Sequence, residues 1–269
     1  MKTYTLLLTL VALLFLSGNL YSQRITFGAK GGISMSNLRS GNSDNPLSSG
    51  YSSRLGNNFG IYGQYHISKT FSFSLGLEYS SQGGLKDKFQ AYQIPLDYAQ
   101  YFVPDELPPY LYANFKKETK LDYLLVPVLA KRNWKINQKF AVYAAAGPYI
   151  GFLLNAHQVV TGSGPIYQDQ EKETLLPFSP ELIEGKADIK ADLHTVNVGV
   201  NGLLGFSYRF NQENAVFLEC GGNYGFLSIY KSTAKGKNYT HSGVITVGYA
   251  FMFHERYKNR YHRTPYFKW

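Results

Sequence analysis

The sequence predicts an all-β fold, an eight-stranded antiparallel up-and-down transmembrane β-barrel with long extracellular loops. Three observations predict it. Apolar and polar residues alternate with period two in successive segments from Arg24 onward. The connections between these segments alternate between short and long, and an apolar N-terminal run marks the chain for export. A hairpin hidden in a long loop would raise the strand number to ten.

The composition favours strands over helices. The 269 residues include 26 Gly, 23 Tyr and 18 Phe, a mixture that suits a pleated sheet. The net charge of +9 is spread over segments that we expect to be loops and a tail. Because no basic helix or long Lys/Arg block is present, we expect no nucleic-acid partner. The lone Cys220 excludes an intramolecular disulfide.

Residues 1–22 are interpreted as a secretory signal peptide. Met1 and Lys2 give a positive start, and the apolar run from Leu6 to Leu16 is too short to cross a bilayer as a helix. Cleavage is expected near Ser22 or Gln23. The alternative is an uncleaved anchor, whereas the absence of a Cys after the run speaks against a lipoprotein.

The barrel is predicted over residues 24–253, and the segment after Phe71 is its clearest strand. Phe71, Phe73, Leu75 and Leu77 share one face, whereas Ser, Gly and Glu residues share the other. A segment around Pro127 is apolar on both faces, so its parity is undefined. In chain order the expected strands are Ile25–Ser34, Phe59–Ser68, Phe71–Ser80, Leu121–Trp134, Phe140–Leu154, Val196–Phe210, Val216–Phe226 and Ile245–Phe253.

Parity alone does not decide which face points outward, and a soluble lipocalin-like barrel would bury the apolar face. Three features favour the membrane version. The second face consists of Gly, Ser, Asn and isolated charges, which cannot form a dry core. Several strands reach nine residues, the length that crosses an apolar bilayer. A closed barrel also pairs every backbone polar group.

The connections support the same topology. Short turns are expected at 68–70, 135–139 and 211–214. Long loops are expected at about 36–58, 83–118 and 155–193, with a shorter one at 231–240. Short periplasmic turns with long external loops are typical of bacterial outer-membrane barrels. We therefore expect the cell outer membrane of a Gram-negative bacterium, with outer-membrane lipids as surroundings.

The polar face predicts a filled lumen, because eight strands enclose only enough space for side chains. Opposite charges there can pair, as buried charges must. A narrow ion path through Glu78, His66 and Glu219 is the functional alternative. The expected interior network is Lys30, Gln64, His66, Glu78, Asn197, Asn201, Arg209, Glu219 and Asn223.

The last strand carries a pattern that resembles the signal read by the barrel-assembly machinery, which is therefore an expected partner during biogenesis. Its residues are Thr246, Gly248, Phe251 and Phe253. The chain continues beyond this strand with a basic and aromatic segment, residues 254–269, that we expect in the periplasm. That segment could bind lipid phosphates or a periplasmic or secretion-system protein, although a disordered tail is the simpler reading.

A series of short motifs resembles the PorT-type outer-membrane β-barrel family of Bacteroidota. The motifs are Phe27–Ile33, Ser36–Leu38, Leu75–Gly83, Leu121–Leu129, Ala146–Leu153, Gly221–Gly225 and Val247–Tyr249. The resemblance covers most strands but not the long loops, and it lies in the order of the motifs. It implies a small outer-membrane barrel. The family takes its name from a component of the type IX secretion system, so a role in that system is one implied function.

The 83–118 loop is rich in aromatic and Pro residues, which suits recognition because rigid rings bury area at low entropic cost. Its candidate recognition residues are Tyr92, Tyr98, Tyr101, Tyr110 and Tyr112. Self-packing over the barrel mouth is the alternative interpretation. The sequence thus predicts a non-enzymatic barrel that is structural or docks a partner through its loops.

A lipid-modifying enzyme is the rival from another class. His241 and Ser228 are expected near the external rim on the apolar face, but no acidic residue on that face would orient the histidine. We therefore expect no enzymatic activity and no cofactor. The six His residues are scattered along the chain, so no metal site is expected.

Overall fold

The computed structural model describes residues 25–41, 45–92, 108–176, 182–232 and 236–253. The predicted signal peptide and the 254–269 segment lie outside these residues. The elements are β1 (Ile25–Ser40), β2 (Arg54–His66), β3 (Phe71–Tyr92), β4 (Leu111–Lys135), β5 (Phe140–Ser163), β6 (Leu182–Asp188), the 3-10 helix η2 (Lys190–Asp192), β7 (Val196–Arg209), β8 (Asn214–Gly225) and β9 (Asn238–Phe253).

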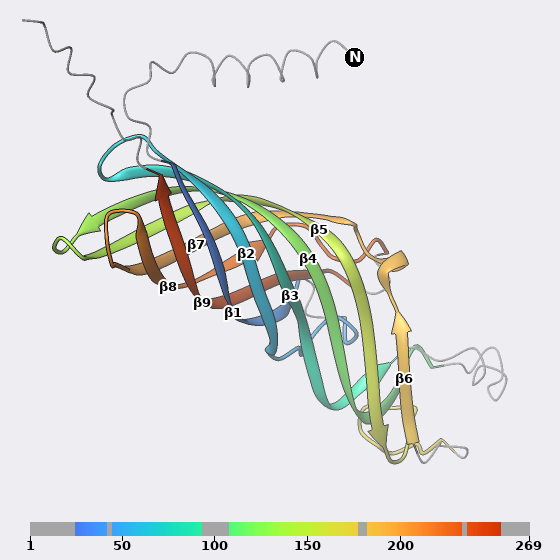
Figure 1. Cartoon of the computed structure of the whole chain (residues 1–269). Coiled ribbons are helices and arrows are strands. Elements are labelled where there is room, and N and C mark those ends of the chain that lie inside the picture. The colour runs from blue at the N-terminus through green and yellow to red at the C-terminus, as the bar shows by residue number, and fades with distance from the viewer. Residues whose placement is uncertain (1–24, 42–44, 93–107, 177–181, 233–235, 254–269) are drawn as a thin grey trace, which may run out of the picture.

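Eight strands close into a ring in which every strand is antiparallel to both neighbours (Figure 1). The ring is closed where β1 pairs with β9 and where β4 pairs with β5. The ninth strand, β6, lies outside the ring and pairs with the end of β5 from His157 to Ser163. The prediction of an eight-stranded up-and-down barrel is therefore confirmed, with one added strand rather than a hidden hairpin.

The apolar face of the wall points outward. Leu204 is 67% exposed and Phe59 is 54% exposed, whereas Glu78 on the other face is only 4% exposed. A lipocalin-like arrangement would show the reverse, so that alternative is wrong. An uncharged outer surface of this kind suits hydrocarbon, because the ladder hydrogen bonds leave no strand edge open around the ring.

Aromatic rings gather on the outside of the barrel at its short-turn end. Phe27 and Phe253 touch edge to face at 5.7 Å on β1 and β9, and Phe140 stacks on Phe206 at 5.5 Å on β5 and β7. Aromatic girdles of this kind mark the membrane–water interface in outer-membrane barrels. Since short turns are periplasmic in such barrels, this girdle marks the periplasmic interface.

The surroundings of Pro127 explain why the inward and outward faces of β4 could not be distinguished from the sequence. The β3–β4 ladder is interrupted between the pairs Leu75–Val128 and Glu78–Leu125, opposite the proline, which has no N–H to donate. The residues on both sides of Pro127 are apolar because the outward face meets lipid and the inward face meets a hydrophobic cluster. Leu121, Tyr123 and Leu125 are each about 1% exposed or less and point into the lumen.

That cluster corrects the expectation of a polar interior throughout. At the long-loop end, inward side chains of β4 and β5 pack against residues from the loops, and together they form a hydrophobic core inside the barrel. Because the loops exclude water there, the lumen can be filled with hydrocarbon. The core comprises Leu38, Leu121, Tyr123, Leu125, Tyr149, Leu153, Ala156, Ile189, Leu193, Ile229 and Tyr230.

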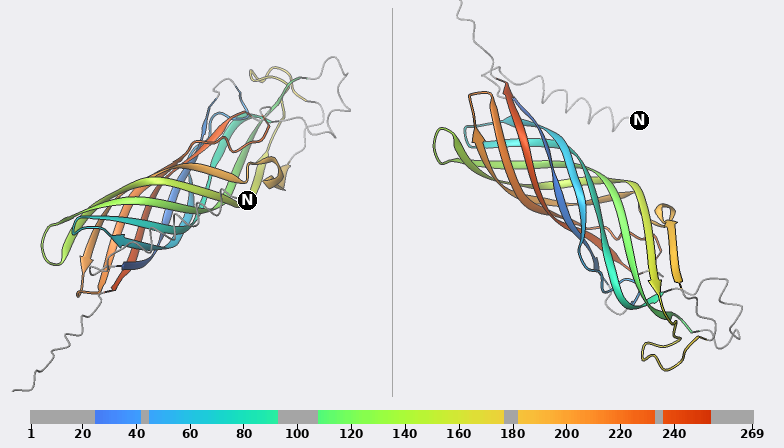
Figure 2. Two further views of the ribbon diagram at one scale, coloured as in Figure 1. Left: turned by 90° about the horizontal axis from the view of Figure 1, so that it is seen from above. Right: turned by 60° about the horizontal axis from the view of Figure 1, so that its bottom comes forward.

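The strands are longer than predicted at the extracellular end. β3, β4 and β5 have 22, 25 and 24 residues, whereas β2 and β8 have 13 and 12. The expected loops 83–118 and 155–193 are therefore wrong in large part, because both contain paired strand. With β6 the extended strands form a sheet beyond the barrel mouth, which we call the extracellular platform (residues 85–92, 111–118, 157–163 and 182–188) (Figure 2).

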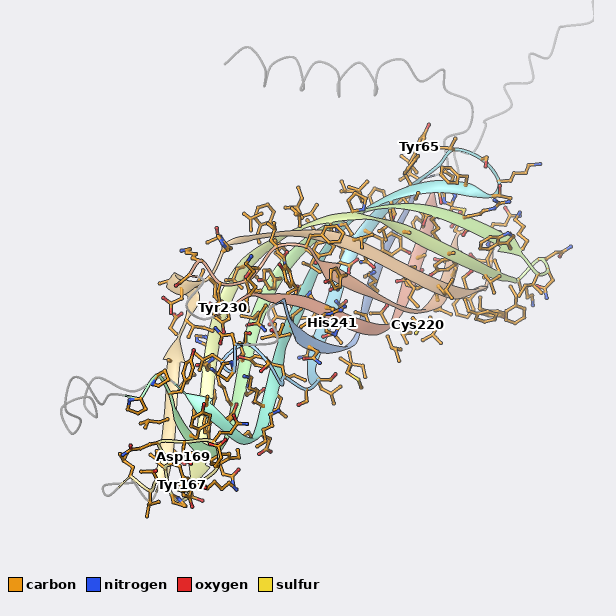
Figure 3. The ribbon with its side chains drawn as sticks, turned by 180° about the vertical axis from the view of Figure 1, so that it is seen from behind. Tyr65, Tyr167, Asp169, Cys220, Tyr230 and His241 are labelled. Carbon is orange, nitrogen blue, oxygen red and sulfur yellow. The ribbon has the colours of Figure 1, made fainter. Side chains whose placement is uncertain are left out.

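Among the residues that the structure describes, no helix combines the length and hydropathy needed to span a membrane. Cys220 is exposed on the outer face of β8 (Figure 3) and has no disulfide partner.

Candidate functional site

The centre of the lumen holds a three-residue ion cluster. Lys30 of β1 lies with its Nζ 2.8 Å from Oε1 of Glu78 on β3 and 3.2 Å from Oε2 of Glu219 on β8. All three side chains are at most 10% exposed. The three strands are separated in the ring by β2 and β9, so the cluster joins distant parts of the wall. A buried lysine between two carboxylates meets the requirement that buried charges be paired.

Glu219 also ties the cluster to the opposite wall. The hydroxyl of Tyr143 on β5 donates to Oε1 of Glu219 at 2.9 Å, and the hydroxyl of Thr246 on β9 donates to Oε2 at 3.4 Å. Hydrogen bonds therefore run across the lumen from β5 to β8. These contacts fill the cross-section at this level, as expected for eight strands.

Three aromatic rings form a layer next to the ion cluster, on its periplasmic side, and each occupies a recess left by a glycine directly across the ladder. Tyr62 faces Gly28, Tyr143 faces Gly205 and Phe217 faces Gly248. A Cβ added at these glycines would lie 2.4, 2.1 and 2.1 Å from the facing ring. The glycines are needed for space, because a larger side chain would push the rings out of the lumen. We call these three rings the aromatic floor.

A second polar network lies below the ion cluster. Nζ of Lys131 donates to Oε1 of Gln64 at 3.3 Å, and Nε2 of Gln64 donates to Ser72 at 2.9 Å. The hydroxyl of Thr26 and the ring of His66 are joined at 2.9 Å. Lys131 also lies 3.5 Å from the centre of the Tyr143 ring, a cation–π contact. This network connects the aromatic floor to the periplasmic mouth.

Amide groups occupy the lumen above the cluster. Nε2 of Gln82 lies 3.4 Å from Oδ1 of Asn223, and Nδ2 of Asn197 donates to Thr240 at 3.0 Å. Asn201 is buried on the same inward face.

The nine interior residues predicted from parity all lie on the inward face. The structure brings Lys30, Glu78 and Glu219 into direct contact, whereas Gln64 and His66 belong to the lower network. Arg209 lines the periplasmic mouth. The alternative of an ion path through Glu78, His66 and Glu219 stays a prediction; His66 contacts Thr26 and Gln64 in the lower network.

Sequence reasoning missed several residues of these networks. Lys131 and Tyr143 were not recognised as network residues, because their strands contain many apolar or small residues. Each nevertheless lies two positions from other inward residues of its strand. Arg54 was missed because β2 was expected to begin later. A parity count carried through Pro127 would have placed Lys131 inside.

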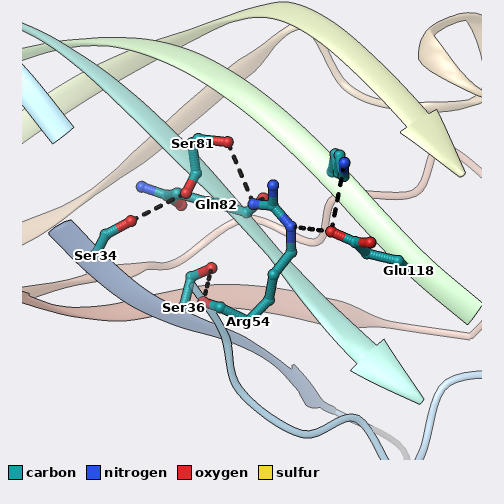
Figure 4. A network of polar contacts seen from close by, with 7 residues as sticks. Ser34, Ser36, Arg54, Ser81, Gln82 and Glu118 are labelled. Atoms are coloured by element: carbon teal, nitrogen blue, oxygen red, sulfur yellow. Dashed lines mark hydrogen bonds and ion pairs between the residues drawn. The ribbon is translucent and has the colours of Figure 1, made fainter. Parts of the chain in front are cut away.

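At the extracellular rim, Arg54 of β2 crosses β3 to reach β4. Its Nε donates to Glu118 at 2.7 Å, and its Nη1 donates to the hydroxyl of Ser81 at 3.2 Å (Figure 4). Burial alone would raise the pKa of Glu118, but the hydrogen bond from Arg54 and the charges of Lys120 and Arg54 outweigh it and lower the pKa below its ordinary value. This pair fixes the base of the platform to the barrel.

Lys86 anchors the β1–β2 loop over the mouth. It is 2% exposed, and its Nζ donates to the backbone carbonyls of Pro46 and Leu47 at 3.3 and 2.9 Å. Its ammonium also lies 4.6 Å from the centre of the Tyr51 ring. Burial, followed by the charges of Lys117 and Lys88, lowers the pKa of Lys86 to about 7.

The platform has a small core and an aromatic cluster of its own. Leu111, Ala113 and Phe115 of β4 pack against Ile166 and Leu176 of the loop that follows β5. Nearby, Phe89 stacks on Tyr112 at 6.1 Å, contacts Tyr167 edge to face at 5.9 Å and lies under Nζ of Lys172 at 4.5 Å.

The recognition residues predicted from the sequence are placed only in part. Tyr112 belongs to this aromatic cluster, and Tyr110 is half-buried beside it. Tyr92 ends β3, but its side chain lies outside the described part of the chain, as do Tyr98 and Tyr101 entirely.

A sequence profile of the outer membrane protein beta-barrel domain matches residues 19–231, most of the chain. The chain belongs to the outer membrane protein beta-barrel domain family. Its location is the outer membrane, in agreement with the apolar exterior and the closed ring. A search of the curated proteins finds no significant relative.

Several solved outer-membrane barrels are similar to this barrel domain at low sequence identity. Ail of Yersinia pestis, solved with the heparin analogue sucrose octasulfate, is 9% identical with a TM-score of 0.36, over 87% of this chain and 100% of Ail. OprG of Pseudomonas aeruginosa is 13% identical with a TM-score of 0.36, over 87% and 97%. The outer membrane protease OmpT of Escherichia coli is 7% identical with a TM-score of 0.33, over 87% and 99%.

The last strand of this outer-membrane barrel divides its predicted assembly residues between the two faces. Thr246 points inward to Glu219, and Gly248 makes room for Phe217. Phe251 and Phe253 lie 4.7 Å apart on the outer face, within the aromatic girdle. Two of the four residues therefore also shape the lumen.

The rim residues considered for catalysis, His241 and Ser228, are not joined to each other in the part of the chain that the structure describes. His241 pairs across the ladder with Asn37 and Tyr224, and no hydrogen bond joins its ring to Ser228 within the described ranges. Nor do three or more His, Cys, Asp or Glu side chains gather around a metal position in that part of the chain.

Proposed function

We propose that this outer-membrane barrel is non-enzymatic, that its lumen is closed, and that it docks a partner outside the cell through the extracellular platform. The observation that carries the proposal is the platform itself. Three wall strands, β3, β4 and β5, continue past the mouth and form a sheet with β6, which has its own core of Leu111, Phe115 and Ile166. β2 and β8 are only about half as long as β4. Spanning the bilayer does not require this extension.

The platform supports recognition because its aromatic cluster is rigid and partly exposed. Phe89, Tyr112 and Tyr167 are all half-buried and hold each other in place. Asp169 fixes the turn behind Tyr167 by accepting the backbone N–H groups of Glu173 and Thr174 at 2.8 and 2.6 Å (Figure 3). Ordered aromatic side chains at a loop tip lose little entropy when a partner covers them.

Photo-crosslinking in intact cells tests the proposal. A photoreactive amino acid at Tyr167 is expected to give a discrete crosslinked species, whereas the same residue at Leu227, an exposed extracellular position away from the platform, is not. Heat-dependent electrophoretic mobility would verify that both variants fold. A partner captured equally at both positions, or at neither, would contradict the docking role.

The non-enzymatic part of the proposal has a separate test. A lipid-modifying enzyme would change the mass of lipid A, and a deletion strain would regain that mass with the wild-type gene but not with His241→Ala. We expect identical lipid A masses in all three strains, because Nδ1 of His241 accepts or donates no hydrogen bond within the described residues that would orient the ring. A mass change that depends on His241 would overturn this part.

The finer family assignment that we propose is the PorT-type branch of Bacteroidota. It is supported by the motif Leu121–Leu129, which supplies the inward apolar residues Leu121, Tyr123 and Leu125 of the lumen core. A partner within the type IX secretion machinery follows from this assignment. Deletion would then block export of cargo with a C-terminal sorting domain, and normal export would remove this candidate.

A further inference from the structure

The periplasmic end of the lumen is an open cavity, which we call the basic vestibule. Its volume is about 800 Å³, within the range of small-molecule sites. The β2–β3 turn contributes Ser68 and Lys69, and the β4–β5 turn contributes residues from Ile136 to Lys139. Both turns lie at the end opposite the platform (Figure 1).

The vestibule ends inside the barrel. Tyr62, Tyr143 and Phe217 line its inner end, and beyond them Glu219 is bound to Lys30 and Tyr143. The next space along the lumen, which also touches Lys131, measures only about 20 Å³, room for about one water molecule. A solute that enters from the periplasm therefore meets an aromatic wall rather than a passage.

The charged side chains that line the vestibule are all positive. The described residues that line it include Lys69, Lys131, Lys135, Lys139 and Arg209, with no Asp or Glu among them. The ion pairs formed within the described ranges involve Lys30, Arg54 and Lys120, and none of the five vestibule cations.

Lys131 is the innermost of these cations. Its Nζ contacts a neutral amide oxygen of Gln64 and the face of Tyr143, which orient the ammonium without neutralising it. The nearest carboxylate beyond the floor, Glu219, is held by Lys30, Tyr143 and Thr246. Cations that converge on a concave space attract anions strongly, because the low-dielectric walls concentrate their field.

From this geometry we infer that the basic vestibule binds a small polyanion that carries at least two phosphate or carboxylate groups. Lys131 lies at the inner end and Lys135 is four residues closer to the mouth on the same strand, a separation of about 13 Å along β4. A single phosphate group is too small to contact cations at both levels of the cavity, whereas a molecule with several anionic groups can contact more than one of them. Arg209 on β7 offers a bidentate partner for one of them.

Phosphate groups reach this end of the barrel from two sources, soluble periplasmic molecules and lipid headgroups of the inner leaflet. The chemistry that the cations recognise is the same for both. The two sources are distinguished by changing the lipid around the protein, while the soluble probe stays constant.

Isothermal titration of the full-length protein in zwitterionic phosphatidylcholine nanodiscs tests the inference, with tripolyphosphate and citrate as probes. We expect binding that weakens with salt and falls about tenfold for Arg209→Gln and further for Lys131→Gln. Lys131→Arg, which keeps the charge, should retain binding. Lys117→Gln on the platform is the matched control and should leave binding unchanged.

Where Lys131→Gln lowers the yield of folded protein, Lys135→Gln with Lys139→Gln at the mouth provides a second test, with the same expected direction. Nanodiscs containing phosphatidylglycerol then identify the source. If the phosphatidylglycerol headgroup occupies the site, tripolyphosphate should bind more weakly in these nanodiscs than in phosphatidylcholine. If the ligand is a soluble molecule, the affinity for tripolyphosphate should be the same in both. Either outcome upholds the site. Absence of binding by both probes, or equal weakening in the Lys117→Gln control, would overturn it.

Discussion

The two ends of the lumen are built on the same strands but have different interiors. Towards the cell exterior, the inward side chains of β4 are Leu121, Tyr123 and Leu125, packed under loops. Towards the periplasm, the inward face of the same strand carries Lys131 and opens into water. The extracellular loops cause this difference. They exclude water from one end of the lumen, which is therefore filled with apolar side chains, whereas charged side chains stay hydrated at the open periplasmic end.

The Lys30 cluster separates these two ends, and breaking it should have the largest effect on stability. Lys30→Met leaves Glu78 and Glu219 buried without a cation, and we expect a loss of about 3–5 kcal/mol in the free energy of unfolding. Urea unfolding in lipid vesicles at pH 8, followed by Trp fluorescence, measures it. Adding Glu78→Gln and Glu219→Gln to Lys30→Met should recover most of the loss. A single Lys30→Met variant as stable as wild type would show that the cluster is not desolvated.

The sealed half should be sensitive to lost hydrocarbon volume. Leu121 is fully buried, so Leu121→Ala is expected to cost about 3 kcal/mol through lost burial and a cavity. Leu204→Ala, at a position 67% exposed on the lipid face, is the control and should cost far less in the same unfolding assay. If the two variants lost equal stability, the extracellular half could not be a packed core.

The aromatic floor depends on space beside the rings. Gly205→Ala would place a Cβ 2.1 Å from the Tyr143 ring, whose hydroxyl is held by Glu219, and we expect a loss of about 1–3 kcal/mol. Gly202→Ala, three residues away on β7, meets nothing within 4 Å and serves as the control. Equal melting temperatures for the two variants would mean that the ring moves aside freely.

These residues also show what the sequence could and could not predict. Alternation placed Glu78 and Glu219 inside, because parity depends only on spacing along one strand. It could not pair them with Lys30 or Tyr143, because register between strands depends on closure of the whole ring. The platform was predicted as loops because the alternation of apolar residues such as Leu111, Ala113 and Phe115 with polar ones is too short to indicate a strand. The hydrophobic core inside the mouth was missed because inward residues of β4 and β5 pack there against residues of loops far away in the sequence, such as Leu193 and Ile229.

A smaller effect, a dependence of local stability on pH, should appear in the β1–β2 loop that Lys86 anchors over the mouth. The pKa of Lys86 is about 7 in the folded protein, below its ordinary value of 10.5, so from pH 7 to 10.5 the unfolded state binds more protons. Stability of the docked β1–β2 loop therefore rises with pH across this window and gains nothing below pH 7. Protease cleavage within residues 45–51 should be slower at pH 9 than at pH 6, after correction for the protease. Lys86→Met should abolish the difference, and a difference that persists in this variant would exclude Lys86 as its source.

The closed centre between the two ends is the claim on which the rest depends, and conductance in planar lipid bilayers tests it most directly. The wild-type barrel should show no unitary current, because Lys30, Glu78, Glu219 and Tyr143 occupy the cross-section. Replacing these four residues with Ala should open a small, steady conductance. Stable single-channel current through the wild-type protein would contradict the account.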